Sequence, residues 1–192
     1  MQKKQTSDFK SLITKEDYER LIKQFKGKGK TDFQTNHYFD TARFSLKALD
    51  TSLRVRERDD DDISLTYKRK KGYNMDVRTV QIDKDKFHEI RANGAVNIPE
   101  IDEELAKLIK DQKLINFLSL STLRLALPYY SGTLAIDKSE YLGATDYEIE
   151  YSTESYHQGK DEFIKIIGDL NINYKKCDKK IQRAYNRLKE IN

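Results

Sequence analysis

The chain has 192 residues, of which 37% are hydrophobic and 35% are charged, and it contains twelve tyrosines and eight phenylalanines. A chain of this length can bury a core as one domain, and its aromatic content excludes a disordered polyelectrolyte. The 36 basic and 32 acidic residues leave a net charge of only +4, which argues against non-specific coating of nucleic acid. Any anion site must therefore come from a local arrangement of charges.

The chain contains a single cysteine, Cys177, which excludes an internal disulfide framework and fits a reducing compartment. We interpret Cys177 as an ordinary thiol. No stretch approaches the ~20 apolar residues that a membrane-spanning helix needs. A soluble, cytoplasmic protein without a membrane partner is expected.

Alternation of apolar and polar residues with period two predicts eight strands. The expected strands cover residues 5–12, 34–40, 52–58, 63–71, 76–82, 115–127, 132–139 and 144–152. Helices are expected from Thr14, a suitable N-cap, to Gly27 or Gly29, and over 84–92, 100–112, 156–170 and 177–190. The predicted fold class is α+β, and this many antiparallel strands suggests a barrel or a sandwich.

Two charged segments between these elements could be mistaken for ligand sites. The four aspartates at 59–62 lie between two strands of matching length, where we expect a solvated hairpin turn and not a metal cluster. The stretch 26–30 alternates lysine with glycine but lacks the spacing of a phosphate-binding loop. We expect it to be a mobile linker.

Basic residues are concentrated on one face of two neighbouring strands. Arg54 and Arg56 share a face because they are two residues apart, and Lys68 and Lys70 do the same on the next strand. Arg124 adds a charge to a later strand. Like charges on adjacent strands repel unless water screens them or an anion lies between them. The pattern alone leaves both a solvated sheet and an anion site open.

Acidic residues alternate on another predicted strand. Asp146, Glu148 and Glu150 lie on one face, and Tyr147 and Ile149 lie on the other. Aligned carboxylates repel unless a cation or basic groups lie between them, and Mg²⁺ prefers such oxygen ligands. The face fits either metal binding or a solvated edge with salt bridges.

Several motifs resemble those of the CYTH, or triphosphate tunnel metalloenzyme, superfamily. The segment 36–40, Asn-His-Tyr-Phe-Asp, resembles its NxYFD motif, and 53–56, Leu-Arg-Val-Arg, resembles its LRxR motif. The segment 65–68, Arg124, and the segments 134–137, 148–150 and 180–183 follow in the order of that family. The resemblance extends over nearly the whole chain, and the order of the motifs makes it more specific than any one of them.

This resemblance implies a single domain over residues 1–192, an eight-stranded antiparallel β-barrel or tunnel with helices packed outside. It implies binding of a triphosphate and its hydrolysis with Mg²⁺ or Mn²⁺. The implied phosphate ligands are Lys10, Arg54, Arg56, Lys68, Arg124, Lys180 and Arg183. Glu148 and Glu150 are the implied metal ligands, with Asp8 in a lesser role, and Glu148, Glu150 and Lys68 are the implied catalytic residues.

The first strand departs from the E-x-E-x-K motif of the family. Alignment on Lys10 puts Thr6 and Asp8 at the two glutamate positions. Threonine carries no carboxylate, and aspartate is one methylene shorter than glutamate. We therefore expect weaker metal binding or weaker activation of water.

The first hypothesis is a metal-dependent hydrolase of inorganic triphosphate or of an organic triphosphate. The alternative is a module with little or no activity that binds triphosphate, polyphosphate or a nucleotide, because the acidic motif is incomplete. Adenylate cyclase-like activity ranks lower. An RNA-binding barrel ranks below both, since Tyr67 lies on the face opposite Lys68 and cannot interleave with it. A homodimer is left open.

Overall fold

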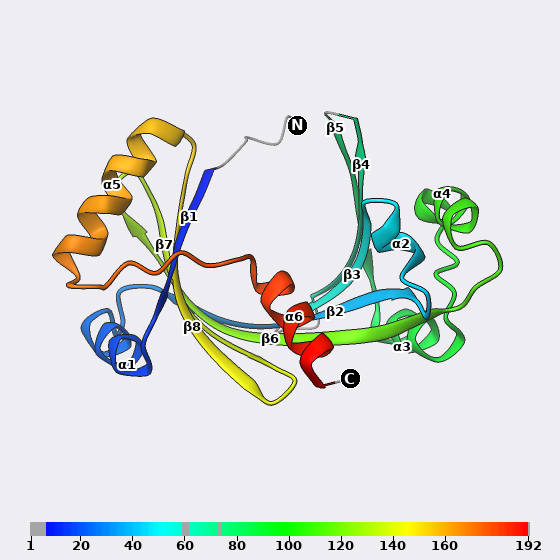
Figure 1. Cartoon of the computed structure of the whole chain (residues 1–192), viewed down its shortest axis with the longest axis horizontal. Coiled ribbons are helices and arrows are strands. Elements are labelled where there is room, and N and C mark those ends of the chain that lie inside the picture. Colours follow the sequence, from blue (N-terminus) through cyan, green and yellow to red (C-terminus); the bar gives the residue numbers. More distant parts are fainter. Residues whose placement is uncertain (1–6, 59–61, 73, 192) are drawn as a thin grey trace. The chain divides into compact units, whose positions relative to one another are not determined.

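The computed structural model describes residues 7–58, 62–72 and 74–191, and in these the chain forms eight strands and six helices (Figure 1). The strands are β1 (Ser7–Ile13), β2 (Lys30–Thr41), β3 (Thr51–Arg58), β4 (Ile63–Lys71), β5 (Asn74–Ile82), β6 (Leu114–Tyr129), β7 (Gly132–Tyr141) and β8 (Ala144–Thr153). The helices are α1 (Lys15–Gln24), α2 (Ser45–Ala48), α3 (Lys84–Asn93), α4 (Pro99–Ile109), α5 (Tyr156–Asp169) and α6 (Lys180–Ile191). The strands form one sheet in the order β1-β8-β7-β6-β2-β3-β4-β5. The predicted α+β class and its eight antiparallel strands are confirmed.

The chain divides into two compact units. Unit 1 combines Met1–Phe33 with Thr122–Asn192, and unit 2 is Gln34–Ser121. The strands β2 and β6 each contribute residues to both units. The expectation of one domain over residues 1–192 stays a prediction.

In unit 1, one face of the sheet is apolar and is covered by α1 and α5. Leu125, Ile136, Ile149 and Tyr151 of the strands pack there with Leu21 of α1. Phe163 and Ile166 of α5 belong to the same buried cluster. Because side chains alternate along a strand, the charged residues of β6, β7 and β8 are left on the opposite face.

In unit 2, α2, α3 and α4 cover an apolar face in the same way. Leu53, Val55 and Leu65 of β3 and β4 are almost completely buried and cluster with Leu46 of α2 and Ile90 of α3. The predicted alternation of β3 is therefore confirmed, and its arginines lie on the face away from these helices.

Helix α2 has no counterpart among the predicted elements, because it is only four residues long. Its first turn is fixed by Asp40, whose carboxylate accepts hydrogen bonds from the backbone N–H groups of Leu46 at 2.9 Å and Lys47 at 3.0 Å. Asp40 is buried and belongs to the segment that resembles the NxYFD motif. In this chain it holds a helix terminus in place.

The lysine- and glycine-rich stretch 26–30 is a tight turn, not the linker we predicted. Gly27 has a φ of +75°, a left-handed conformation that favours glycine. A Cβ on Gly29 would come within 2.5 Å of the Ala126 carbonyl oxygen, so the turn packs closely on β6. Strand β2 therefore starts at Lys30, before its predicted start.

Other boundaries shift less. Helix α6 begins at Lys180, not at 177, and α4 ends at Ile109. The predicted aspartate turn falls mostly outside the described residues. Among the described helices, none combines the length and the apolar composition that crossing a bilayer requires.

Candidate active site

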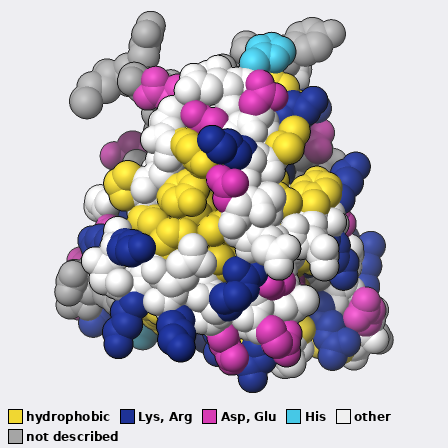
Figure 2. Space-filling model, turned by 90° about the vertical axis from the view of Figure 1, so that its left-hand side faces the viewer, with side chains coloured by type: hydrophobic (Ala, Val, Ile, Leu, Met, Phe, Trp, Pro, Cys, Tyr) yellow, Lys and Arg dark blue, Asp and Glu magenta, His cyan; other side chains and the backbone are white. Residues whose placement is uncertain are grey.

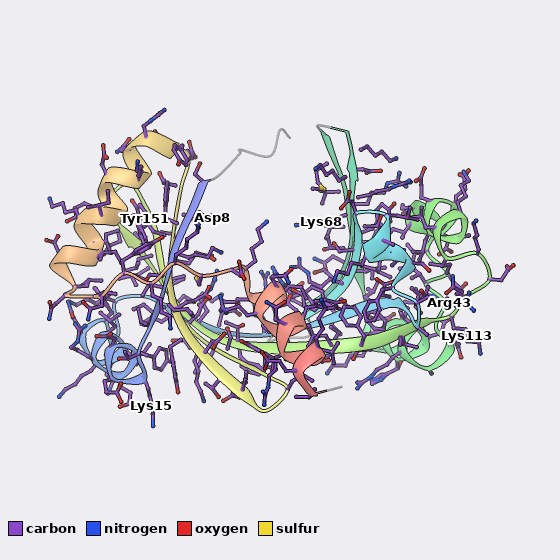
Figure 3. All side chains as sticks on the ribbon, viewed as in Figure 1. Asp8, Lys15, Arg43, Lys68, Lys113 and Tyr151 are labelled. Carbon is purple, nitrogen blue, oxygen red and sulfur yellow. The ribbon has the colours of Figure 1, made fainter. Side chains whose placement is uncertain are left out.

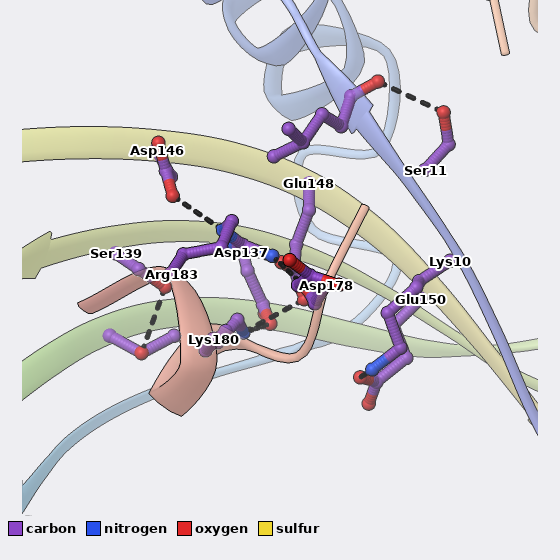
Figure 4. A network of polar contacts seen from close by, with 12 residues as sticks. Lys10, Ser11, Asp137, Ser139, Asp146, Glu148, Glu150, Asp178, Lys180 and Arg183 are labelled. Atoms are coloured by element: carbon purple, nitrogen blue, oxygen red, sulfur yellow. Dashed lines mark hydrogen bonds and ion pairs between the residues drawn. The ribbon is translucent and has the colours of Figure 1, made fainter. Parts of the chain in front are cut away.

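The carboxylates of β8 lie at the centre of a polar network in unit 1 (Figure 4). Asp146, Glu148 and Glu150 share one face of the strand, as predicted. Antiparallel pairing puts Asp137 of β7 opposite Glu148, and Lys10 of β1 opposite Glu150. Residues directly opposite each other share a face, so the register gathers acids and a base from three strands.

Arg124 of β6 joins two of these carboxylates. Its Nε and one terminal nitrogen bind the two oxygens of Asp137 at 2.8 and 2.7 Å, and the same terminal nitrogen lies 3.2 Å from Glu150. Lys10 Nζ approaches the other oxygen of Glu150 at 3.2 Å. Two of the predicted phosphate ligands therefore share one carboxylate.

Helix α6 adds two more bases to the same network. Lys180 Nζ binds Asp137 and lies 3.3 Å from Glu148 Oε1. Arg183 binds Asp146 through Nε at 2.6 Å and the other Glu148 oxygen through a terminal nitrogen at 2.5 Å. The spacing of Lys180 and Arg183 puts both on one side of the helix.

The four bases and four carboxylates of this network balance in formal charge. Burial alone would raise the pKa of Asp137, but the hydrogen bond from Arg124 and the charge of Lys180 outweigh it and lower that pKa. Burial likewise opposes ionisation of Glu150, and the charges of Arg124 and Lys10 still lower its pKa below the usual value. Both groups are therefore carboxylates at neutral pH.

The donor chemistry of this network fits a hard divalent cation. Glu148 is almost completely buried, and its Oε1 accepts no hydrogen bond from the described residues although Lys180 Nζ is near. In the described part of the chain, no three His, Cys, Asp or Glu side chains form a metal cage. Mg²⁺ commonly takes one or two carboxylates and completes its shell with water and phosphate oxygens, which such a site permits.

Asp8 lies on the same face of β1 as Lys10, two residues away. It is exposed and is labelled in Figure 3. Its carboxylate accepts a hydrogen bond from Ser152 Oγ at 2.8 Å. It is less enclosed than Glu148. The other substituted family position, Thr6, lies outside the described residues.

The remaining predicted ligands, Arg54 and Arg56 of β3 and Lys68 of β4, belong to unit 2, and Figure 3 labels Lys68. Arg54 stands opposite Thr66, Arg56 stands opposite Ser64, and Lys68 stands opposite Ser52. The three bases therefore share a face but are offset along the strands, which lessens the direct repulsion we expected.

On the other side of β3, β2 also offers uncharged groups. Arg56 Nε donates to Asn36 Oδ1 at 3.0 Å, and Tyr38 stands opposite Arg54. Arg54 Nε is buried and has no hydrogen-bond acceptor among the described residues. A buried donor without an acceptor is unfavourable, and an oxygen of a bound anion would supply the missing acceptor. The position therefore suits an incoming anion.

Sequence reasoning did not assign a role to Asp137. The residue is completely buried and binds both Arg124 and Lys180. Its strand shows little alternation, because Leu134, Ala135, Ile136 and Asp137 are all buried. A charged residue within such a run is itself a signal, since buried charges require partners.

The fold and the network define a class of protein: an α+β chain whose antiparallel sheet carries ionised acids and bases on the face away from its covering helices. The CYTH domain model matches residues 7–185, and the chain belongs to the CYTH family. The match contains all of unit 2 and most of unit 1.

Curated and structural relatives agree with this assignment. The chain is 31% identical over 183 residues to the Bacillus subtilis protein named "Putative triphosphatase YjbK", with 93% of each chain covered. It is also 31% identical to a Bacillus halodurans protein whose crystal structure is described as a "putative adenylate cyclase"; the TM-score is 0.76, with 92% of this chain and 95% of that one covered.

A third comparison concerns fold alone. HpAC1 from Hippeastrum, a "putative adenylyl cyclase" described as having a dominant triphosphatase activity, superposes with a TM-score of 0.78. The identity is 20%, and 94% of each chain is covered.

Proposed function

We propose that this chain hydrolyses a triphosphate, inorganic or organic, in a reaction that depends on a divalent cation. The observation that carries the proposal is the network of unit 1, in which carboxylates of one sheet face pair with two bases of the same face and two bases of helix α6. The names of the relatives, one a triphosphatase and one an adenylate cyclase, support a triphosphate as the substrate.

The bases are proposed as ligands of the phosphate oxygens. Arginine suits this role because it stays ionised and can bind two oxygens at once, while lysine acts as a point charge. The proposed ligands are Lys10, Arg124, Lys180 and Arg183 in unit 1 and Arg54, Arg56 and Lys68 in unit 2. Lys68 is exposed, so it can reach a ligand without first leaving a buried position.

The carboxylates are proposed to hold Mg²⁺ or Mn²⁺. Glu148 and Glu150 are the main ligands, Asp137 is a third, and Asp8 lies at the edge of the site. The cation would supply charge neutralisation for the phosphate oxygens. Because the pKa values of Asp137 and Glu150 are lowered, these side chains are ionised at neutral pH and need not lose a proton before they bind a cation.

In the proposed reaction, the oxygen of a water molecule forms a bond to the terminal phosphorus while the bridging P–O bond breaks, and the proton that this water loses is taken up by the departing diphosphate. Inorganic triphosphate then yields phosphate and diphosphate. Such a reaction demands mainly positioning and stabilisation of negative charge, which fixed arginines and lysines provide. The ion pairs to Asp137 and Glu148 hold Arg124 and Arg183 in fixed orientations.

The test is release of phosphate from inorganic triphosphate in Mg²⁺, in Mn²⁺ and in EDTA. We expect release with either cation and its loss in EDTA. Equal release in all three conditions would contradict the dependence on a divalent cation. No release in any of them would contradict hydrolysis.

A binding module without turnover is the second candidate. It is favoured by the engagement of Asp137, Glu148 and Glu150 by bases, which compete with a cation for the same oxygens. The presence of Thr6 in place of a family glutamate favours it too. Calorimetric titration with triphosphate separates the two: tight binding without phosphate release supports the module.

A further inference from the structure

A cavity of about 570 Å³ lies in unit 1 between β1, α5 and the segment that leads to α6. Most of its wall is apolar: Phe9, Tyr156, Phe163, Ile164, Ile167 and Tyr174 line it. Its volume is in the range of pockets that bind small organic molecules. None of these six residues belongs to the charged network described above.

Four of the lining side chains are aromatic and in mutual contact. The Phe9 ring lies 5.5 Å from that of Tyr156 and 5.9 Å from that of Phe163, and Phe163 meets Tyr174 edge-on at 6.4 Å. Tyr156 and Tyr174 nevertheless remain 58% and 59% exposed. Their ring faces are therefore available for stacking against a planar ligand.

The surface around this cavity combines apolar and basic groups. Figure 2 shows hydrophobic side chains gathered on the face that carries α5, with Lys and Arg side chains around them. Lys10, Lys160 and Lys176 line the cavity, against a single carboxylate, that of Asp8. An apolar wall with three lysines suits an aromatic ligand that carries negative charge.

Lys10 connects this cavity to the charged network. It lines the cavity, and its Nζ lies 3.2 Å from Glu150 Oε2. A ligand with an aromatic ring in the cavity could therefore extend its charged part toward Lys10 and Glu150.

We propose that this cavity binds the planar aromatic part of an organic triphosphate whose phosphate chain is held by the network around Glu150. This inference rests on the proposed function and names its substrate class: a triphosphate ester with an aromatic ring, in preference to inorganic triphosphate. The aromatic side chains supply stacking, and Lys160 and Lys176 supply charge at the entrance.

A first test uses Cys177, the single cysteine of the chain, which lines the cavity and is partly buried. Alkylation by iodoacetamide, followed by intact mass, is measured with ATP, with AMP and with inorganic triphosphate. The reaction is run at alkaline pH, because burial raises the pKa of this thiol. We expect ATP and AMP to slow alkylation at least about fivefold more than inorganic triphosphate does, since an aromatic ring would cover the thiol.

A second test compares two exposed isoleucines on helices of unit 1. Ile164 lines the cavity and is 61% exposed, whereas Ile191 is 50% exposed and is not among the residues that line it. Ile164→Ala together with Tyr174→Ala should raise the KM for ATP about tenfold and leave that for inorganic triphosphate unchanged. Ile191→Ala should change neither.

Equal protection of Cys177 by all three compounds, or equal effects of the variants on both substrates, would overturn the assignment of the cavity. Hydrolysis of inorganic triphosphate alone would then still support the proposed function. Conversely, protection by ATP and AMP that is lost in Tyr174→Ala, without turnover of any triphosphate, would support the cavity and contradict hydrolysis.

Discussion

The polar faces of the two units differ in how their arginines are partnered. In unit 1, Arg124 and Arg183 each bind two carboxylates. In unit 2, Arg54 stands between Tyr38 and Thr66, which are uncharged. Its Nε is buried without an acceptor among the described residues.

This difference leads us to expect different roles for the two units in binding and catalysis. An arginine with two carboxylates already has its charge balanced, so an arriving phosphate must compete with fixed anions. An arginine beside uncharged groups gains more from the same phosphate. We therefore expect unit 2 to contribute most to phosphate affinity, and the carboxylates of unit 1 to contribute most to cation binding and rate.

The largest effect is expected for Glu148→Gln. Removing this charge takes a buried carboxylate from the proposed cation site, so kcat for triphosphate hydrolysis in Mg²⁺ should fall about 10²–10³-fold. Phosphate release at saturating substrate measures the change. Glu140→Gln, on an exposed carboxylate of β7, is the control and should retain the rate of the unmodified chain.

An effect on affinity is expected for Arg54→Ala. A charge-assisted hydrogen bond contributes about 1.5–3 kcal/mol, so the Kd for triphosphate should rise roughly 10–100-fold. Calorimetric titration in EDTA measures binding without turnover. Arg43→Ala, on an exposed arginine of the same unit, should leave the Kd unchanged, and similar losses in both variants would contradict the special role of Arg54.

A smaller effect, on stability, is expected for Gly159→Ala. A Cβ at this position of α5 would clash with the Thr153 methyl group and come within 2.8 Å of the Phe9 ring. The overpacking should lower the free energy of unfolding by about 1–3 kcal/mol. Gly168 of α5 has open space around its Cα, so Gly168→Ala should be neutral or stabilising by up to about 1 kcal/mol. Urea unfolding measures both.

The smallest effect concerns pH and His37 of unit 2. Burial against Phe87 and the charge of Arg91 lower its pKa below 6.5, while Glu57 opposes the shift. The unfolded chain then takes up a proton at higher pH than the folded chain does. The contribution of neutral His37 to the free energy of unfolding is therefore complete above pH 6.5. It declines as the pH falls through the lowered pKa that His37 has in the folded chain.

The pH dependence is measured by urea unfolding between pH 7.5 and 5.5. His37→Gln should reduce the loss of unfolding free energy over this pH range by about 1 kcal/mol or less. His88→Gln, on an exposed histidine of the same unit, should leave the slope as it is. An unchanged slope in His37→Gln would assign the decline to other groups.

Much of the fold could be predicted from local pattern. Leu53 and Val55 alternate with Arg54 and Arg56, and the strand has this alternation because one face packs on helices. The start of β2 at Lys30 could not be predicted, because it depends on how closely Gly29 packs on the distant strand β6. Helix α2 was missed for a similar reason, since it is held by the side chain of Asp40 and not by its own propensity.

The sequence predicted most of the charged residues that form the site, but not which of them pair with one another. The spacing of Glu148 and Glu150 put both on one face, yet only the register of β7 shows that Asp137 lies opposite Glu148. The side of the sheet that α6 covers with Lys180 and Arg183 depends on the path of the chain after α5. Sequence spacing does not contain such long-range contacts.

The most direct test of this account is thermal unfolding with inorganic triphosphate, in EDTA and in Mg²⁺, for the unmodified chain, Arg54→Ala and Glu148→Gln. A ligand that binds the folded state raises the Tm by mass action. We expect Arg54→Ala to lose most of the shift in EDTA. We expect Glu148→Gln to keep or exceed the shift in EDTA but to gain no further shift from Mg²⁺. The opposite pattern, with Arg54→Ala unaffected and Glu148→Gln shifted by Mg²⁺ like the unmodified chain, would contradict the division between phosphate-binding arginines and cation-binding carboxylates.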